Sequence, residues 1–538
     1  MGSIRTILCG ILMLCFWNGK TQNVALKWAL HLKCDSGDVF SSAITIDEDN
    51  NTYFEVAFRD DSLIIDSHSY ISPHRNGQIV TKYNSDGKRV WVKEENEISY
   101  RASLGIRTLL AHGENLLIPF VFYDTTCWGG DTIIPRGYRD GFVDYVDKNG
   151  KTLWSLQLEG YMNLWDVRSF SNGDFIIMGE FLDSLRVFDK SVYGTCKAKG
   201  EWDYFFLRID PKGNKIWQKV ISKCGNVYLP EMIIDKEDNI YFAAYYSGKV
   251  EFEDRNIENP TASNRYLNFL AKFDEHGKIN WVTSFGSSNG NNSVQGLEVS
   301  SNNEIRLLNL NKGNPYNLSG QWISKGSSIL GFDENGKFRG EIVSLGIASC
   351  LAINKYDELI VDQTLSASPQ NYLFSKYRAN SENVFIEKAK SNYFGTTHQV
   401  KVNRQNFIAL EGTFTGPLEL NSEYKFNNTG LGSNAFIALY EDLTATNIIS
   451  TADEKNPVSV YPNPTRDKIN ISFSLEQPES IGFRLIDARG VEYWQKQNVE
   501  LMESRYKYEI DISHLPIGVY TLIMSSTSFY TSRKIVKQ

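Results

Sequence analysis

The sequence predicts an all-β protein, a seven-bladed β-propeller followed by a small β-sandwich, and three observations lead to it. Tryptophans recur at separations of 63, 63, 63 and 64 residues, at Trp28, Trp91, Trp154, Trp217 and Trp281. Short aromatic or aliphatic runs bounded by turn residues surround them. Aromatic residues make up 13% of the 538 residues, and they suit the half-buried surface of a strand. A repeat of short strands and turns indicates a β architecture.

An octapeptide of constant shape ends at four of these tryptophans. It reads DKNGKTLW at 147–154 and recurs as NSDGKRVW at 84–91, DPKGNKIW at 210–217 and DEHGKINW at 274–281. A strand-like run precedes each copy, as in NFLAKF at 268–273. Asp or Asn can bond its own backbone and Gly accepts positive φ, so the octapeptide predicts a tight hairpin turn. We interpret its Trp as a packing residue between or within blades.

Each repeat also contains an earlier hairpin, in which a polar turn leads into an aromatic or aliphatic strand. Clear copies lie at 47–58, 171–181, 235–246 and 403–414, and weaker copies at 112–122, 301–310 and 355–363. Two hairpins make a four-stranded antiparallel sheet, and such sheets arranged radially form a propeller. Seven first hairpins predict seven blades, with an open or six-bladed ring as the alternative. The strand around Trp28 lacks a preceding hairpin, so we expect it to complete the last blade, which ends at 434–443.

The repeat is similar to that of a known family. The stretch DNIYFAAYYSGKVEF at 238–252, followed by NFLAKFDEHGKINW at 268–281, resembles the unit of the bacterial β-propeller repeat family. The resemblance covers about 24–443 and implies the propeller fold over a domain that we place at 23–443. It implies no single activity, because function on such folds resides in individual sites.

The first 22 residues have the layout of a secretory signal peptide. Arg5 precedes the mostly apolar stretch Thr6–Trp17, and a polar segment follows. This stretch is too short to span a bilayer, and we expect cleavage near Gln22 or Asn23. A lipoprotein interpretation is weaker, because both cysteines of the stretch follow leucine rather than a small residue. No later segment has the length of a membrane span, so we expect no transmembrane segment after cleavage.

The chain changes character after Leu443. Residues 444–457 are polar and read as a linker, and strand-like runs fill 458–538. The residues that identify this block are Tyr461, Pro462, Asn463, Pro464, Thr465, Asp467, Ile469–Ile471, Leu515–Tyr520 with Gly518 and Tyr520, and Lys534–Val536. Together they resemble the type A sorting domain of the Bacteroidetes type IX secretion system. The resemblance implies the type IX machinery as a partner and export through the periplasm, ending in release or surface anchoring.

Charge and cysteine spacing exclude several function classes. The net charge is −8, and no basic run offers a surface for nucleic acid. Two of the 7 cysteines lie in the signal peptide, and the others show no CxxC spacing, so we predict neither zinc nor another cofactor. Cys196 and Cys224 flank a predicted hairpin and can form a disulfide after export, or remain buried thiols.

No catalytic signature fits its context. GSSNG at 286–290 puts Ser288 in a nucleophile position, but a strand-like run follows instead of the helix that a nucleophile elbow requires. GLGSNA at 430–435 mimics a dinucleotide loop and is also followed by a strand-like run. DEDNN at 47–51 resembles half a calcium loop, yet it lacks the required later Gly and Glu. We identify no catalytic residue and no metal ligand, although a carboxylate pair for glycoside hydrolysis stays open.

One long loop interrupts the repeat at 123–141. It contains Trp128, Arg136, Tyr138 and Arg139, and exposed aromatics beside arginine are typical of binding sites. We expect these four residues to bind a ligand; the alternative is a loop that packs over a blade edge. The loops at 261–266 and 366–372 are weaker candidates.

These observations favour a secreted or cell-surface binding or adhesion scaffold for glycan or protein. The missing catalytic signature favours binding over enzymatic activity. One alternative is an extracellular hydrolase acting on polysaccharide or peptide, with its site at the propeller axis. Another is a structural surface component.

Overall fold

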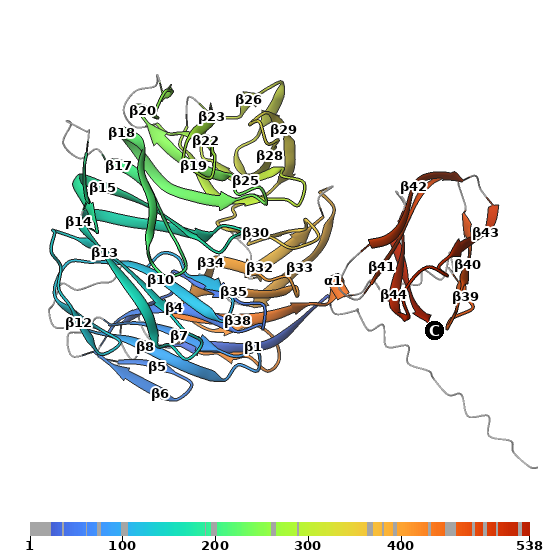
Figure 1. The fold of residues 1–538 in the computed structure, drawn as a ribbon. Helices are drawn as coiled ribbons and strands as arrows, with labels where there is room; N and C mark the ends of the chain where they lie inside the picture. The colour runs from blue at the N-terminus through green and yellow to red at the C-terminus, as the bar shows by residue number, and fades with distance from the viewer. Residues whose placement is uncertain are drawn as a thin grey trace, which may run out of the picture. The chain divides into compact units, whose positions relative to one another are not determined.

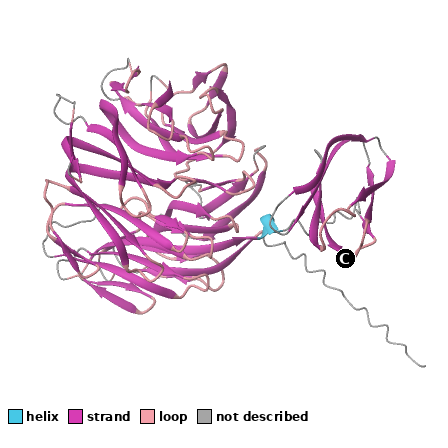
Figure 2. Ribbon diagram, viewed as in Figure 1, coloured by secondary structure: helices cyan, strands magenta, loops and turns pink. Residues whose placement is uncertain are grey.

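The computed structural model shows a chain made almost wholly of strands (Figure 2). The described residues are 23–538 except 35–36, 61, 73–76, 98–105, 189, 195–201, 260–264, 288–289, 363–369, 379–380, 391–394, 429–431, 447–458, 476–478, 488–491, 502–503 and 526–529. Within them the helix is one turn, α1 (Leu443–Thr446), at the start of the predicted linker. The predicted all-β class is confirmed. The expected signal peptide, the rest of the linker, Ser288 and Cys196 lie outside the described residues.

The chain divides into two compact units, Leu26–Glu441 and one that contains Asp442–Gln538. The first is built of four-stranded antiparallel groups, which we call blades (Figure 1). In chain order, the first groups are β3 (Ile44–Ile46), β4 (Thr52–Arg59), β7 (Gly77–Tyr83) and β8 (Arg89–Glu97), then β9 (Leu110–His112), β10 (Asn115–Phe122), β13 (Asp140–Val146) and β14 (Thr152–Ser169). The next groups are β14, β15 (Phe175–Val187), β17 (Trp202–Ile209) and β18 (Lys215–Ile234), then β18, β19 (Ile240–Ser247), β22 (Leu267–Phe273) and β23 (Ile279–Phe285), then β24 (Asn292–Val299), β25 (Ile305–Asn311), β28 (Gly326–Phe332) and β29 (Phe338–Ser344). The last groups are β30 (Leu351–Ile353), β31 (Leu359–Val361), β32 (Gln370–Tyr377) and β33 (Asn383–Lys390), then β34 (Gly395–Val402), β35 (Phe407–Phe414), β38 (Asn434–Asp442) and β1 (Val24–Leu32).

The first strand of the chain closes the last blade. Strand β1 lies beside β38, so the two ends of the propeller sequence share one sheet (Figure 1). This confirms the expected closure. The first strands of the blades contact one another in the cyclic order β3, β9, β14, β18, β24, β30, β34 and back to β3. Because β14 and β18 each serve two blades, three sheets merge into one, and the predicted count of seven separate blades stays a prediction.

The repeated tryptophans pack between blades. A Cβ added to Gly213 would lie 2.9 Å from the Trp154 ring, and one added to Gly150 would lie 2.9 Å from Trp91. Both glycines have positive φ, 84° and 80°, which other residues rarely adopt. The further pairs are Gly87 with Trp28, Gly277 with Trp217 and Gly336 with Trp281. The turn glycine of one octapeptide therefore receives the tryptophan of the preceding blade.

A second repeated contact joins the first hairpin of a blade to its third strand. The Lys272 ammonium lies 3.7 Å from the Asp235 carboxylate. The same pairing joins Lys82 to Asp47 at 4.0 Å, and a related pair joins Arg208 at 2.8 Å to Asp174, which lies at the other end of its turn. In the blade that begins with β9, His112 and Tyr145 occupy these positions and form a hydrogen bond of 3.0 Å. Acid and cation are thus replaced together, which identifies the acidic turn residues as structural.

The turn at Asp47 shows why it is not a calcium loop. One Asp47 carboxylate oxygen accepts hydrogen bonds from the backbone N–H of Asp49 and Asn51 at 3.0 and 2.8 Å. The other accepts from the Asn51 amide and the Tyr53 hydroxyl at 2.8 and 2.9 Å. The hydrogen bonds that the Asp47 carboxylate accepts therefore stabilise the hairpin that the sequence predicts here.

Short added strands extend the blades at their edges. The hairpin of β11 (Thr126–Trp128) and β12 (Asp131–Ile133) pairs with β8. Other added strands are β2 (Asp38–Phe40), β16 (Lys190–Tyr193), β20 (Lys249–Glu251), β21 (Asn256–Glu258), β36 (Leu418–Glu419) and β37 (Lys425–Phe426), and separate hairpins are β5 (Ser62–Ile65) with β6 (His68–Ile71) and β26 (Tyr316–Leu318) with β27 (Gln321–Ile323). Covering an edge strand removes a template for aggregation.

The second unit is a small β-sandwich, as predicted. One sheet orders β39 (Ser459–Tyr461), β40 (Lys468–Leu475) and β43 (Ser504–Asp511). The other orders β42 (Glu492–Leu501), β41 (Glu479–Asp487), β44 (Gly518–Ser525) and β45 (Tyr530–Lys537). Their facing side chains, such as Ile471, Phe483 and Leu522, form one buried cluster.

Candidate functional site

The loop at 123–141 divides into a buried part and an exposed part. Trp128 is 3% exposed, and its indole N–H donates to the Asp144 carboxylate at 2.7 Å. Its ring lies 5.1 Å from Phe120. The expectation that Trp128 is exposed is wrong, because a buried carboxylate on β13 offers its N–H a partner. At Trp128 the loop packs over the edge of β8, which agrees with the alternative interpretation that this loop covers a blade edge.

Asp140 holds the rest of the loop in place. Its carboxylate accepts hydrogen bonds from the backbone N–H of Arg136, Gly137 and Gly160 at 2.7, 2.9 and 2.9 Å. The Arg136 side chain is 65% exposed and forms an ion pair of 2.8 Å with Glu159. Arg136 is therefore accessible but already neutralised.

Arg139 lies at the centre of an aromatic cluster, in which Tyr123 and Tyr138 are exposed and the other rings are half-buried. Its guanidinium lies 5.2 Å from the ring centroid of Tyr123 and 5.1 Å from that of Tyr161. The Trp202 ring follows at 5.7 Å. Tyr138 is 70% exposed, and its ring lies 4.7 Å from Tyr161. The structure thus brings two of the predicted residues, Tyr138 and Arg139, together with rings from β14 and β17.

The cluster continues along β14 to a second arginine. The exposed Arg107 lies with its guanidinium 4.3 Å from the centroid of the Trp165 ring. Neighbouring side chains reduce the hydration of the Arg107 guanidinium, which lowers its pKa; Glu180 opposes this lowering, and Arg139 adds a smaller contribution to it. We call Arg107, Tyr123, Tyr138, Arg139, Tyr161, Trp165 and Trp202 the aromatic patch.

One buried acid lies beneath the patch. Glu180 on β15 is 5% exposed and accepts a hydrogen bond of 2.5 Å from the Asn163 amide. Burial raises the pKa of Glu180, while hydrogen bonds from Tyr204 and Asn163 and the charge of Arg139 oppose the rise. This arrangement keeps a carboxyl group within electrostatic reach of Arg139 without an ion pair between them.

Three tyrosines flank Glu180 on the side of β18 and β19. The rings of Tyr228 and Tyr245 stack with centroids 5.3 Å apart and planes at 17°. Tyr266 meets both edge-on at 5.2 Å. Burial raises the pKa of Tyr228, and Tyr266 and Glu180 add to the rise. Tyr266 belongs to the weaker candidate loop at 261–266, whose first residues lie outside the described part, as do most residues of the loop at 366–372.

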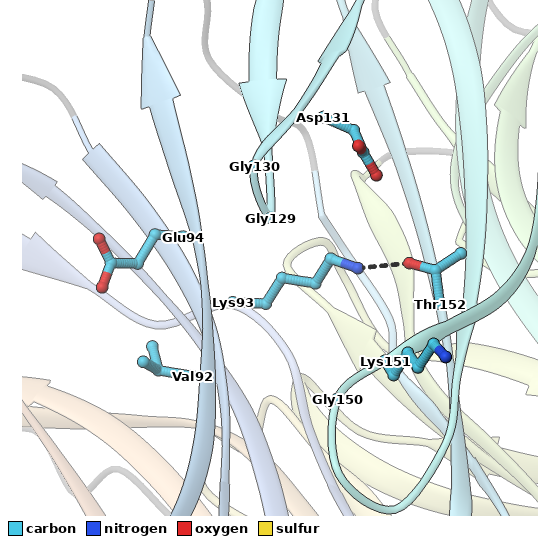
Figure 3. Close-up of a pocket in the computed structure, with 9 residues that line it drawn as sticks. All are labelled: Val92, Lys93, Glu94, Gly129, Gly130, Asp131, Gly150, Lys151 and Thr152. Carbon is cyan, nitrogen blue, oxygen red and sulfur yellow. Dashed lines mark hydrogen bonds between the residues drawn. The ribbon is translucent and has the colours of Figure 1, made fainter.

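A separate pocket of about 510 Å³ lies at the Gly129–Gly130 turn (Figure 3). Figure 3 shows Lys93 pointing toward Thr152, to which its ammonium donates at 2.7 Å. The same ammonium lies 2.6 Å from the Asp144 carboxylate. The charge of Lys93 in this pocket is therefore paired within the protein, and Glu94, Asp131 and Lys151 supply the other charged groups of its lining.

The first strands at the axis contribute a mixed-charge cluster. Asp166 on β14, Glu231 on β18 and Glu298 on β24 interact with one another electrostatically. Arg168 lies 3.0 Å from Asp166, and Lys401 also acts on the two glutamates. Burial and the neighbouring Asp166 raise the pKa of Glu231 to about 7. Among the described residues, no group of His, Cys, Asp and Glu is arranged to hold a metal ion.

The predicted sorting-motif residues tie the C-terminal strand to the start of the sandwich. The Asn463 side-chain oxygen accepts from the Val536 N–H at 2.8 Å, and the Thr465 N–H donates to the Val536 carbonyl at 2.8 Å. Tyr520 is buried, and its hydroxyl donates to the Pro516 carbonyl at 2.7 Å. The other motif residues are Tyr461 at the end of β39, Pro462 and Pro464 directly after it, Asp467 before β40 and Gly518 at the start of β44.

Residues 459–538 match the family described as "Secretion system C-terminal sorting domain". This part of the chain is a type IX secretion sorting domain. The sorting domain directs the protein to the cell surface or the extracellular space, with the type IX machinery as its partner. No helix among the described residues is long and apolar enough to cross a membrane.

Comparisons with other proteins found only low sequence identity. An uncharacterized WD repeat-containing protein of Acanthamoeba polyphaga mimivirus is 24% identical over 193 residues, which is 33% of this chain. The chain spans only 14% of that relative's length. An ulvan lyase, a polysaccharide lyase solved with -[GlcA(1-4)Rha3S]-, aligns over 74% of this chain and 95% of its own at 8% identity and a TM-score of 0.42. PorZ, a surface component of the type IX secretion system of Porphyromonas gingivalis, aligns over 93% and 81% at 8% identity and a TM-score of 0.23. Neither likeness bears on the site.

Proposed function

We propose that the protein is a binding or adhesion scaffold that acts outside the cell and binds a glycan through the aromatic patch. One observation carries the proposal: Tyr123, Tyr161 and Trp202 all lie within 5.7 Å of the Arg139 guanidinium. Aromatic faces stack on the C–H faces of sugar rings, and arginine donates several hydrogen bonds to hydroxyl or acidic groups.

The patch is also placed for access. Tyr138 is 70% exposed and Tyr123 is 40% exposed. A group of large rings in contact with water is unfavourable in free energy, so it is typical of a surface that binds a partner. Tyr161 and Trp202 lie on strands β14 and β17, Tyr123 directly follows β10, and Tyr138 lies in the loop before β13. Two of the four rings are therefore held by strands before a ligand arrives. A rigid aromatic surface loses little conformational entropy on binding.

The proposal is tested by measuring polysaccharide binding of the exported protein on immobilised glycans. Replacing Tyr138 with Ala should weaken binding by roughly tenfold, the loss of a central aromatic contact. Trp322→Ala is the matched control, because Trp322 is 66% exposed on the β26–β27 hairpin and lies outside the patch. Equal binding of both variants, or binding only to protein ligands, would contradict the proposal.

The axial cluster supports a second candidate, an extracellular hydrolase acting on polysaccharide or peptide. Burial and Asp166 raise the pKa of Glu231 to about 7, next to the neighbouring Glu298. Burial raises the pKa of Glu298 as well. Glycoside cleavage requires two carboxyl groups, one to donate a proton and one to act as base or nucleophile, and the cluster offers two neighbouring glutamates. Release of reducing ends from a polysaccharide, lost in Glu231→Gln and retained in Tyr138→Ala, would favour this candidate.

A further inference from the structure

Two arginines of the aromatic patch lack an acidic partner. The Arg139 guanidinium donates to the Met162 carbonyl at 2.5 Å and to the Tyr123 hydroxyl at 2.6 Å. The Arg107 guanidinium lies over the Trp165 ring. Across the part of the chain that the structure describes, neither guanidinium comes within 4.0 Å of a carboxylate.

The neighbouring arginines differ in this respect. Arg136 and Arg186 both pair with Glu159, at 2.8 and 3.2 Å. Arg168 pairs with Asp166 at 3.0 Å. Unpaired arginine is therefore not a general property of these strands, and it coincides with the aromatic patch.

The two free charges also act on each other. Loss of hydration is the main cause of the lowered pKa of Arg107; the charge of Glu180 opposes it, and Arg139 adds a smaller lowering of its own. Bringing like charges together is unfavourable unless an anion joins them. Glu180 opposes the effect of Arg139 on Arg107 and is the larger of the two influences, but burial raises its own pKa and favours its neutral form, which carries no charge to pair with either arginine. The remaining positive charge stands out in a protein whose net charge is −8.

We propose that the ligand of the aromatic patch is an acidic polysaccharide, whose carboxylate or sulfate groups pair with Arg107 and Arg139 while its sugar rings stack on the aromatic side chains. This inference rests on the proposed glycan-binding function. A guanidinium that stacks on a ring keeps its N–H edge available, and arginine binds planar or tetrahedral oxyanions through two parallel hydrogen bonds. An acidic protein segment can pair with the two arginines but has no sugar rings to stack on the aromatic side chains, so we favour the glycan.

The first experiment compares polymers that share a backbone and differ in charge. The exported protein is titrated with polygalacturonate and its fully methyl-esterified form, and with dextran sulfate and dextran. We expect the acidic member of at least one pair to bind roughly tenfold or more tightly, with affinity that falls as salt rises. The two pairs separate carboxylate from sulfate recognition.

Each outcome of that experiment has a distinct meaning. Equal affinity for acidic and neutral members would overturn the acidic class and leave glycan binding standing. Binding to none of the four polymers, together with binding to an acidic peptide, would overturn both proposals.

The second experiment tests the arginine itself. Arg107 is exposed, so Arg107→Gln should keep the melting temperature and lose roughly tenfold in affinity for the acidic polymer. Arg107→Lys should recover part of that loss through charge alone. Arg378→Gln is the control, since Arg378 is also exposed but forms an ion pair of 2.7 Å with Glu382. Unchanged binding by Arg107→Gln would overturn the proposal even where the acidic polymer binds.

Discussion

The indole of Trp154 covers Gly213 of the next blade, and its N–H donates to the Pro211 carbonyl at 3.0 Å. Trp91 and Trp281 make the same hydrogen bond, to Lys148 and Glu334, also at 3.0 Å. One side chain thus joins two blades by packing and by a polar contact with the turn. The octapeptide repeat therefore stabilises the contact between neighbouring blades.

Replacing Trp154 with Ala should lower the free energy of unfolding of the propeller by about 3 kcal/mol, the lower end for a large aromatic because the ring is partly exposed. Chemical denaturation followed by circular dichroism measures the change. Trp322→Ala, which removes a ring that is 66% exposed on the β26–β27 hairpin, should stay within about 0.5 kcal/mol of the parent. A Trp154→Ala protein as stable as the Trp322→Ala protein would show that the contact is not stabilising.

The turn glycine gives a second, independent prediction. Gly213 has a φ of 84°, and a Cβ there would lie 2.9 Å from the Trp154 ring. Gly213→Ala should destabilise the propeller by about 1–3 kcal/mol through strain and crowding. If the crowding arises from the indole, the combined Gly213→Ala and Trp154→Ala protein should lose less than the sum of the two changes. Strict additivity would mean that the two residues do not interact.

The repeat could be predicted from sequence because its determinants are local. A turn such as 147–150 needs an Asp and a Gly at fixed spacing, and the period of Trp154 and its counterparts follows from the length of one blade. The sequence does not decide whether Trp154 packs within its own blade or against Gly213 of the next blade, because both arrangements give the same spacing. Closure by β1 followed from the unpaired Trp28 strand.

The site was less accessible to sequence reasoning. Tyr123, Tyr161 and Trp202 belong to three segments that meet only through the fold, and Tyr161 lies in a strand whose residues alternate like any other. The expectation for Trp128 was wrong because a loop that interrupts the repeat is typical of an exposed segment. Its indole is buried against Asp144, which lies on another strand, and the sequence does not show this contact. The unpaired state of Arg139 is a property of its surroundings, and no motif records it.

A buried acid at the closing blade predicts a pH dependence of stability. Glu411 on β35 is 0% exposed, and the Ser41 hydroxyl donates to its carboxylate. Burial raises the pKa of Glu411 to about 8, well above the value of an unfolded carboxyl. The folded state therefore holds the proton more tightly, so the stability from this group is full at acidic pH and declines as pH rises toward 8.

The variant Glu411→Gln should flatten this decline. Between pH 5 and pH 8, its melting temperature should fall less than that of the parent protein, because an amide cannot ionise. Glu382→Gln serves as the comparison, since Glu382 is an exposed partner of Arg378. A parent protein whose stability rises over this pH range would contradict the assignment.

Deleting residues 458–538 should leave the propeller folded and held in the periplasm. The sorting domain forms its own sandwich with its own core, so we expect its loss to remove the export signal and leave the propeller core intact. Cell fractionation and surface labelling in the native host measure the location. Normal surface levels of the truncated protein would refute the sorting role.

A single side chain should weaken export without deleting the domain. Asn463 binds the Val536 N–H at 2.8 Å and so fastens β45 to the start of the sandwich. Asn463→Ala leaves that N–H without its side-chain acceptor, which should loosen the C-terminal strand by about 1 kcal/mol. If the secretion machinery recognises the fastened strand, the variant accumulates in the periplasm while its propeller melts at the parent temperature. Asn470→Ala, at a site on β40 in the same sandwich, is the control and should be exported normally; equal export of both variants would assign Asn463 a purely structural role.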